Sequence, residues 1–164
     1  MDTQLQIEVL AKRSRWNVEQ IGRDFAALVR YALAALFVVT GVAKLASGEA
    51  FVETVAGYGL VPTAAVDLVA SAAIVGEVAL GVWLASGLGR RAALGTASGC
   101  LVAFAGVIAL AWWRGAAGDC GCFSGVAESS IGLGAVVRNA ALAAVAVNAA
   151  VVERPRSSFI HRHR

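Results

Sequence analysis

Four long apolar stretches constrain the fold of this 164-residue chain more than any other feature. They run over about residues 26–46, 64–85, 92–113 and 131–152. Each is close to the ~20 residues that an α-helix needs to cross the hydrocarbon core of a bilayer. None shows the alternation of apolar and polar residues that is typical of a membrane-barrel strand. The pattern therefore predicts an all-α membrane protein, a bundle of four transmembrane helices.

The composition favours a membrane protein and excludes several other classes. Hydrophobic residues make up 59% of the chain and charged residues 15%, whereas soluble domains have about 25% charged residues. The 35 alanines and 18 glycines are small residues that let membrane helices pack closely. Disorder is excluded because it requires low hydrophobicity. The net charge of +3 is accounted for by membrane topology, so we expect no nucleic-acid partner.

The distribution of lysine and arginine predicts the orientation, because basic residues gather in cytoplasmic loops. The segment 1–25, the turn between the second and third spans and the tail 153–164 together carry ten of them: Lys12, Arg13, Arg15, Arg23, Arg90, Arg91, Arg154, Arg156, Arg162 and Arg164. The loop over about 47–63 has none, and the loop 114–129 has only Arg114. Both termini are therefore predicted to be inside (N-in, C-in) in a bacterial cytoplasmic membrane, with these two loops outside.

Two segments beside the spans carry further expectations. The leader 1–25 has scattered apolar side chains and is expected to be either a helix lying on the cytoplasmic face or a frayed leader. In the first outer loop, Phe51, Val52 and Val55 share a helical face. This spacing predicts a short interfacial helix that ends at Gly57 and Gly59.

A Cys-Gly-Cys motif in the loop 114–129 carries the most chemical information. Cys120 and Cys122 are separated by Gly121, which lets the backbone fold tightly enough for the two sulfurs to approach. By the charge argument the pair lies outside, on the side that is oxidising in bacteria. A disulfide in so small a ring is expected to be strained, and strained exposed disulfides exchange readily with thiols.

The neighbours of the cysteine pair leave its role open. Asp119 favours the protonated thiol and Arg114 the nucleophilic thiolate, and the sequence does not rank them. The pair could exchange disulfides, brace the loop, or hold a soft metal such as Cu(I). Zinc needs more ligands, and the two histidines, His161 and His163, are predicted on the other side. We therefore assign no metal ligand.

Several short motifs follow one another in a characteristic order: Gly41-Val42-Ala43-Lys44-Leu45, Tyr58-Gly59-Leu60-Val61-Pro62, Glu77, Cys120-Gly121-Cys122-Phe123 and Arg138-Asn139. Over about residues 30–150 this order resembles the MauE/DoxX-like redox-associated membrane proteins. The resemblance implies four membrane helices and a role in methylamine utilisation, where MauE is needed to mature a disulfide-rich dehydrogenase subunit beside a thioredoxin-like partner. One departure is Ser124, where the family is expected to run from Cys-Phe directly into Gly.

Ionisable side chains within the spans need partners, because an unpaired charge in the membrane costs a few kcal/mol. Lys44 and Asp67, near the outer ends of the first two spans, are expected to form one ion pair. Glu77, deeper in the second span, is expected to pair with Arg138 of the fourth, with Asn139 nearby. These residues would either form a polar pocket for a proton or a quinone head group or hold the helices in order.

Cys100 lies near the middle of the third span and has two interpretations. It is a small packing residue, or it is a relay thiol that passes oxidation from the outer loop to a membrane quinone. With three cysteines, the chain cannot hold two disulfides at once.

Three classes of function remain. The first is a membrane component of thiol–disulfide exchange that acts on a thioredoxin-like or disulfide-containing protein outside, with a quinone as candidate cofactor. The second is a non-catalytic assembly or scaffold subunit whose disulfide braces the loop. The third is a small transporter or metal-handling protein. The sequence leaves the substrate, the direction of electron flow and the oligomeric state open.

The predicted topology can be tested with a membrane-impermeant maleimide on intact cells or spheroplasts. Reduced Cys120 and Cys122 should be labelled because their loop is predicted outside, whereas Cys100 should stay protected by the membrane. Labelling that requires the inner face to be opened would contradict the orientation.

Overall fold

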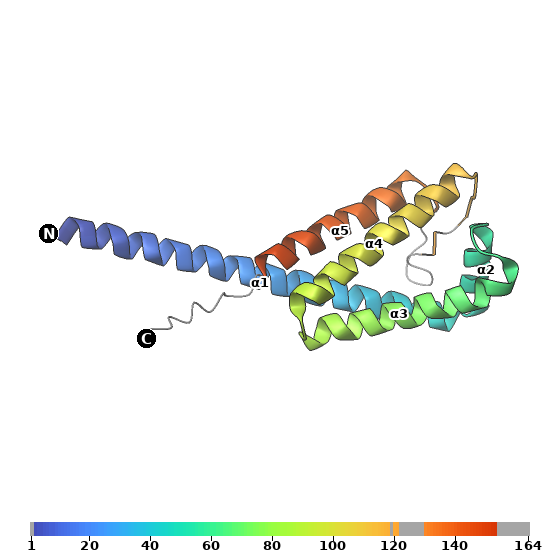
Figure 1. Cartoon of the computed structure of the whole chain (residues 1–164), viewed down its shortest axis with the longest axis horizontal. Coiled ribbons are helices and arrows are strands. Elements are labelled where there is room, and N and C mark those ends of the chain that lie inside the picture. The colour runs from blue at the N-terminus through green and yellow to red at the C-terminus, as the bar shows by residue number, and fades with distance from the viewer. Residues whose placement is uncertain (1, 119, 122–129, 154–164) are drawn as a thin grey trace, which may run out of the picture.

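The computed structural model describes residues 2–118, 120–121 and 130–153, and helices dominate this part of the chain (Figure 1). The elements are α1 (Asp2–Ser47), α2 (Glu49–Gly57), the 3₁₀ helix η1 (Thr63–Ala65), α3 (Val66–Ser86), α4 (Arg90–Trp113) and α5 (Leu133–Val152). Within the described residues, four segments are long and apolar enough to cross a membrane: Trp16–Ser47, Thr63–Ser86, Arg90–Trp113 and Leu133–Val152. The predicted all-α architecture with four membrane helices is confirmed, while the N-in, C-in orientation stays a prediction.

Helix α1 differs from the expected division into a leader and a first span. It continues without a break from Asp2 to Ser47, over 46 residues, and is therefore roughly 70 Å long. That is about twice the ~30 Å thickness of the hydrocarbon core. Its N-terminal part projects beyond the other helices (Figure 1). The leader is thus helical and continuous with the first span, whose apolar part begins at Trp16, and its expected position on the cytoplasmic face stays a prediction.

The short helix expected in the first loop is confirmed as α2. Of the three residues whose spacing predicted the helix, Phe51 and Val55 are buried and Val52 is partly buried. The two buried side chains pack against Val66 and Ala70 of α3. This contact attaches α2 to the end of the bundle that is remote from the α3–α4 turn (Figure 1).

The turn between α3 and α4 depends on a buried arginine of α1. Gly87 and Gly89 have φ values of 72° and 56°, which glycine adopts without steric cost. The Arg30 guanidinium donates hydrogen bonds to the carbonyl groups of Leu84 and Ala85. The last carbonyls of a helix lack partners within the helix, and a cation is favourable at that negative end. Arg30, which the sequence analysis did not assign, therefore caps α3.

Helices α1 and α3 approach closely at two glycines. A Cβ atom at Gly81 would lie 2.7 Å from Cγ2 of Val38 and 3.0 Å from the carbonyl oxygen of Ala34. A Cβ atom at Gly41 would lie 2.7 Å from Cγ2 of Val78. Small residues permit such backbone contacts between membrane helices, so these glycines fix how α1 and α3 pack.

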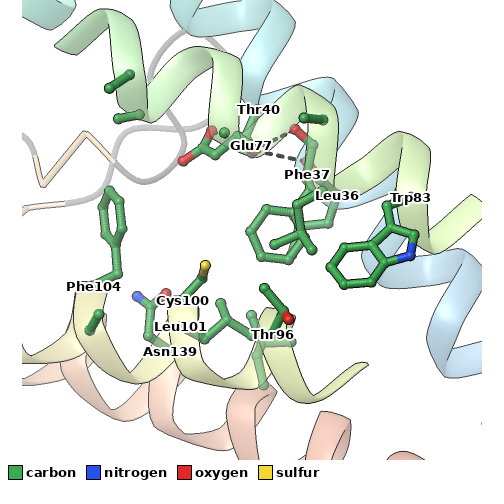
Figure 2. A pocket seen from close by; sticks show the side chains of 17 residues that line it. Leu36, Phe37, Thr40, Glu77, Trp83, Thr96, Cys100, Leu101, Phe104 and Asn139 are labelled. Atoms are coloured by element: carbon green, nitrogen blue, oxygen red, sulfur yellow. Dashed lines mark hydrogen bonds between the residues drawn. The ribbon is translucent and has the colours of Figure 1, made fainter. Parts of the chain in front are cut away.

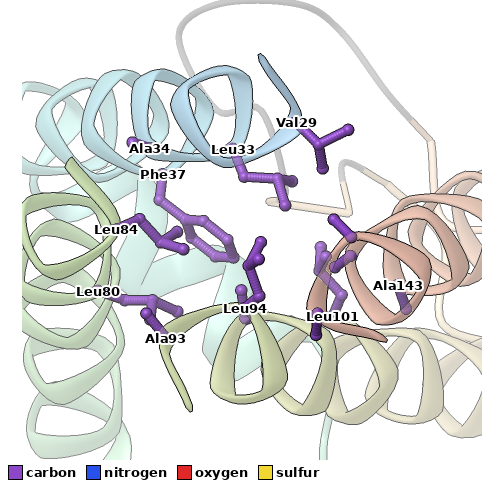
Figure 3. Close-up of a cluster of buried hydrophobic side chains, with 14 of the residues drawn as sticks. Val29, Leu33, Ala34, Phe37, Leu80, Leu84, Ala93, Leu94, Leu101 and Ala143 are labelled. Carbon is purple, nitrogen blue, oxygen red and sulfur yellow. The ribbon is translucent and has the colours of Figure 1, made fainter. Parts of the chain in front are cut away.

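The two ends of the bundle are filled differently. Beside the α3–α4 turn, all four long helices contribute to one apolar cluster, which includes Leu33, Phe37, Leu84, Leu94 and Leu101 (Figure 3). Towards the other end, the α4–α5 pair diverges from the α1–α3 pair (Figure 1). There, α2 and the loop segment with Cys120 and Gly121 lie between the two pairs.

The close contact between α1 and α3 predicts a specific effect of Gly81→Ala. The added methyl group meets backbone and side-chain atoms of α1, so the free energy of unfolding should fall by about 1–3 kcal/mol. The measurement is the thermal midpoint of the purified protein in mild detergent.

Gly95→Ala is the matched control for this substitution. Gly95 is also in the interior of a membrane helix, but a Cβ atom there meets nothing within 4 Å. Both substitutions replace glycine with the better helix former, so Gly95→Ala should leave the midpoint unchanged or raise it. Equal midpoints for the two variants would contradict close packing at Gly81.

Candidate functional site

A buried ion pair joins α1 to α3 in the interior of the bundle. The ammonium of Lys44 pairs with Oε1 of Glu77, and Lys44 is 0% exposed. The hydroxyl of Thr40 donates to Oε2 of Glu77 over 3.4 Å. The rings of Phe51 and Phe104 have their centroids 5.2 Å and 5.3 Å from Nζ of Lys44. Glu77 therefore neutralises the lysine, and two aromatic rings add cation–π attraction.

Both ion-pair predictions made from the sequence were wrong. Glu77 pairs with Lys44 and not with Arg138, and Asp67 is exposed with no ion pair among the described residues. The prediction placed the outer ends of the first two spans at the same depth. Instead, α2 and η1 occupy the intervening loop, and Gly41 of α1 packs against Glu77 and its neighbour. This packing places the last turn of α1 level with the middle of α3.

Cys120 lies in a second buried cluster, formed with α4 and α5. Its side chain packs against Ile108 and Ala135 and is 0% exposed. The hydroxyl of Tyr58, at the end of α2, donates to the carbonyl group of Cys120. Nη2 of Arg138 lies 3.7 Å from the sulfur. Thus α2 covers this cysteine, and a guanidinium from α5 contacts it. Because its side chain is fully buried, the maleimide labelling expected above for Cys120 is not expected from the structure.

Gly121 allows the cysteine segment to lie directly under α2. Its φ of 64° is in the left-handed region, where glycine is favoured. A Cβ atom would lie 3.0 Å from Cγ2 of Thr54, 3.2 Å from the hydroxyl of Tyr58 and 3.3 Å from the ring of Phe51. Both conformation and space therefore require glycine at this position.

The structure brings together only some of the residues predicted around the cysteines. Arg138 contacts Cys120, whereas Arg114, the basic neighbour expected from the sequence, is the exposed residue that follows α4. Three further predicted residues lie outside the described part of the chain: Asp119, Cys122 and Phe123. A disulfide between Cys120 and Cys122 accordingly stays a prediction.

A cavity of about 540 Å³ lies between the two helix pairs (Figure 2). Its polar lining residues are Thr40, Glu77, Trp83, Thr96, Cys100 and Asn139. Cys100 is exposed, which differs from the interpretation as a buried packing residue. Asn139 is buried and donates to the carbonyl group of Ala135 over 2.8 Å. Of the residues expected to form a polar pocket, Glu77 and Asn139 border this cavity, whereas Lys44, Asp67 and Arg138 do not line it, and the pocket for a proton or a quinone head group stays a prediction.

The sequence analysis did not assign Arg30 of the α3 cap, nor Thr40 and Phe104 beside the ion pair. Arg30 was detectable, because it is one of two basic residues in the first apolar stretch. Thr40 and Phe104 gave no signal, since threonine and phenylalanine are ordinary in membrane helices and their roles depend on neighbouring helices.

A comparison with protein families identifies the chain. The family model described as "Methylamine utilisation protein MauE" matches residues 23–152. The chain belongs to the MauE family. No curated protein and no solved structure matches it. The MauE match includes nearly all of the four membrane helices and the segment with Cys120. Membership of the MauE family and the four helices able to cross a membrane together indicate a multi-pass membrane protein. The family description connects the chain with methylamine utilisation.

The Lys44–Glu77 pair predicts a large effect of Glu77→Gln. The substitution leaves the Lys44 ammonium buried without a counter-charge, which should lower the free energy of unfolding by about 3–5 kcal/mol. The loss of stability is measured as the fraction of protein that stays monodisperse after heating in detergent. Adding Lys44→Met should recover part of it, because the unpaired charge is then removed.

Asp67→Asn is the matched control on the same helix. It makes the same chemical change at an exposed carboxylate, so we expect a change within about 0.5 kcal/mol. A double variant of Lys44 and Glu77 that loses as much stability as the sum of the two single variants would show that the ion pair does not couple these residues.

Proposed function

We propose that this MauE family member carries out thiol–disulfide exchange through Cys120 and Cys122, and so supports maturation of an extracytoplasmic protein used in methylamine utilisation. The proposal places it in a bacterial cytoplasmic membrane with the cysteine loop outside. One observation carries it, the 3.7 Å contact between the Arg138 guanidinium and the sulfur of Cys120. A cation beside a cysteine favours the thiolate, which is the nucleophile in exchange.

The exchange proceeds in two steps. A thiolate of the pair attacks a disulfide of the partner, so that a mixed disulfide forms and one partner thiolate leaves. The second cysteine then attacks the mixed disulfide, which releases the other partner thiol and leaves a disulfide between Cys120 and Cys122. Two electrons pass to the partner in this direction. In the reverse direction the pair oxidises a partner dithiol, and a thioredoxin-like protein fits either direction.

The burial of Cys120 assigns different roles to the two cysteines within this proposal. Its sulfur is covered by α2 and packed between α4 and α5, so a protein partner cannot reach it directly. Cys122 would therefore form the mixed disulfide with the partner. Cys120, beside Arg138, would resolve the mixed disulfide from inside the bundle.

A second candidate is an assembly or scaffold subunit whose loop disulfide is structural. The same full burial of Cys120 favours it, because buried cysteines often serve only as small packing residues. The two candidates differ in what serine substitution does. A structural cysteine loses stability when it is replaced, whereas an exchanging cysteine loses turnover while the protein stays folded.

The trapping of a mixed disulfide tests the proposal and the roles. Cys120→Ser removes the resolving cysteine, so the partner should stay covalently attached to Cys122. We expect a reducible band of higher mass in membranes of the native host. Cys122→Ser and the double variant should give no such band, and Cys100→Ser should leave the pattern unchanged.

Two substitutions of Arg138 test the observation that carries the proposal. Arg138→Gln removes the cation, so resolution slows and some mixed disulfide should accumulate even with both cysteines present. Arg138→Lys keeps the charge and should accumulate less. Size-exclusion profiles confirm folding of each variant. The proposal is falsified if neither cysteine variant forms an adduct and both retain full function.

A further inference from the structure

A basic pocket lies at the turn between α3 and α4, at the end of the bundle remote from α2 (Figure 1). Both arginines in its wall, Arg90 and Arg91, are exposed. The carboxylate of Glu153, also in the wall, lies 3.8 Å from Nη1 of Arg90. After Glu153 the sequence adds four arginines and no aspartate or glutamate. The wall of the pocket therefore carries a net positive charge.

A third guanidinium lies directly behind this wall. A Cβ atom at Gly87, which lines the pocket, would be 3.6 Å from Nη1 of Arg30 and 3.8 Å from Nε of Arg90. Arg30 is 3% exposed, and neither ion pair among the described residues includes it. Within the same part of the chain, its Nε is buried without a hydrogen-bond partner. A buried cation without a counter-charge is costly, so an anion in the pocket would stabilise the protein.

The position of the turn favours a lipid over a dissolved anion. Residues 87–89 join two segments that are each able to cross a membrane, Thr63–Ser86 and Arg90–Trp113. The turn therefore lies where the hydrocarbon meets the headgroups. The indole of Trp83 donates to the carbonyl group of Leu88 over 2.9 Å, and tryptophan is typical of that boundary. The Leu88 side chain is 71% exposed, which suits contact with acyl chains.

The larger cavity between α3 and α4 begins close to this pocket. Ala92 in the pocket wall and Thr96 in the cavity wall are one helical turn apart on α4, and both are exposed. Trp83 borders the cavity from α3. The carboxylate of Glu77 and the amide of Asn139 in its lining already have hydrogen bonds within the protein. Hydrocarbon in the cavity would thus strand neither group, and a lipid held at the turn has room there for an acyl chain.

From these observations we propose that the turn between α3 and α4 binds the headgroup of an anionic phospholipid. Arg90 and Arg91 contact the phosphate, because the planar guanidinium matches its oxygens. Arg30 adds its charge from behind Gly87. Basic pockets between membrane helices suit anionic headgroups of this kind. The site depends neither on the proposed thiol–disulfide exchange nor on which end of the bundle is inside.

Binding is tested at the turn itself, with Trp83 as the reporter. In protein whose other tryptophans, Trp16, Trp112 and Trp113, are replaced with phenylalanine, brominated acyl chains quench Trp83 fluorescence on contact. In mixed micelles with a neutral detergent, brominated phosphatidylglycerol should quench at a mole fraction at least about tenfold lower than phosphatidylcholine with the same chains. This ratio is the lipid preference of the site.

Three substitutions test the charges. Arg91→Gln should lower the preference about fivefold, the effect of one arginine near a membrane surface. Glu153→Gln removes the negative charge from the wall and should raise the preference. Arg114→Gln is the matched control, because Arg114 is an exposed arginine at the opposite end of α4. It should leave the preference unchanged.

The outcomes separate the lipid from other anions. Equal quenching by the two lipids, or an effect of Arg91→Gln no larger than that of Arg114→Gln, would overturn the headgroup site. Displacement of the brominated lipid by inorganic phosphate at the same concentration would show a site for dissolved phosphate and overturn the lipid assignment. Should the protein with Trp83 alone not fold, the thermal midpoint of the wild-type protein replaces the quenching. Phosphatidylglycerol should raise that midpoint more than phosphatidylcholine does, and equal shifts would overturn the site.

Discussion

A lysine buried within a membrane bundle must be neutralised, and Lys44 meets this requirement with Glu77. The pair fixes which turn of α1 lies beside which turn of α3, and the close contact at Gly41 fixes the same register sterically. Phe51 of α2 and Phe104 of α4 approach the same ammonium. One charge thereby orients four helices, because each element contributes a group that stabilises it.

The position of α2 depends on this arrangement and in turn determines the environment of Cys120. Phe51 contacts α3 on one side and the segment with Gly121 on the other. Tyr58 holds the carbonyl group of Cys120. The cysteine is therefore enclosed by contacts with α2, α4 and α5, and its nearest identified cation, Arg138, comes from α5. Enclosure and charge together are what the proposed resolving role requires.

The uneven packing of the bundle explains why a cavity lies beside these charged residues. Near the α3–α4 turn, large apolar side chains close the core. Farther along, α3 and α4 present small residues to each other, among them Gly76, Ala79 and Ala103. These cannot fill the space between diverging helices, so Glu77 and Cys100 border a cavity open to the bilayer. In this MauE family member, polar side chains of the bundle interior therefore border the same cavity that opens between α3 and α4.

The sequence by itself determined the four membrane helices, because about 20 consecutive apolar residues have few alternatives to spanning a bilayer. It also determined the short helix α2 and the residues worth following, including Lys44, Glu77 and Cys120. It could not determine which of them meet. The partner of Glu77 and the cation beside Cys120 depend on helix register and on the volume that α2 occupies. Those are set by contacts between residues far apart in the chain, such as Gly41 with Glu77, and only the tertiary structure decides them.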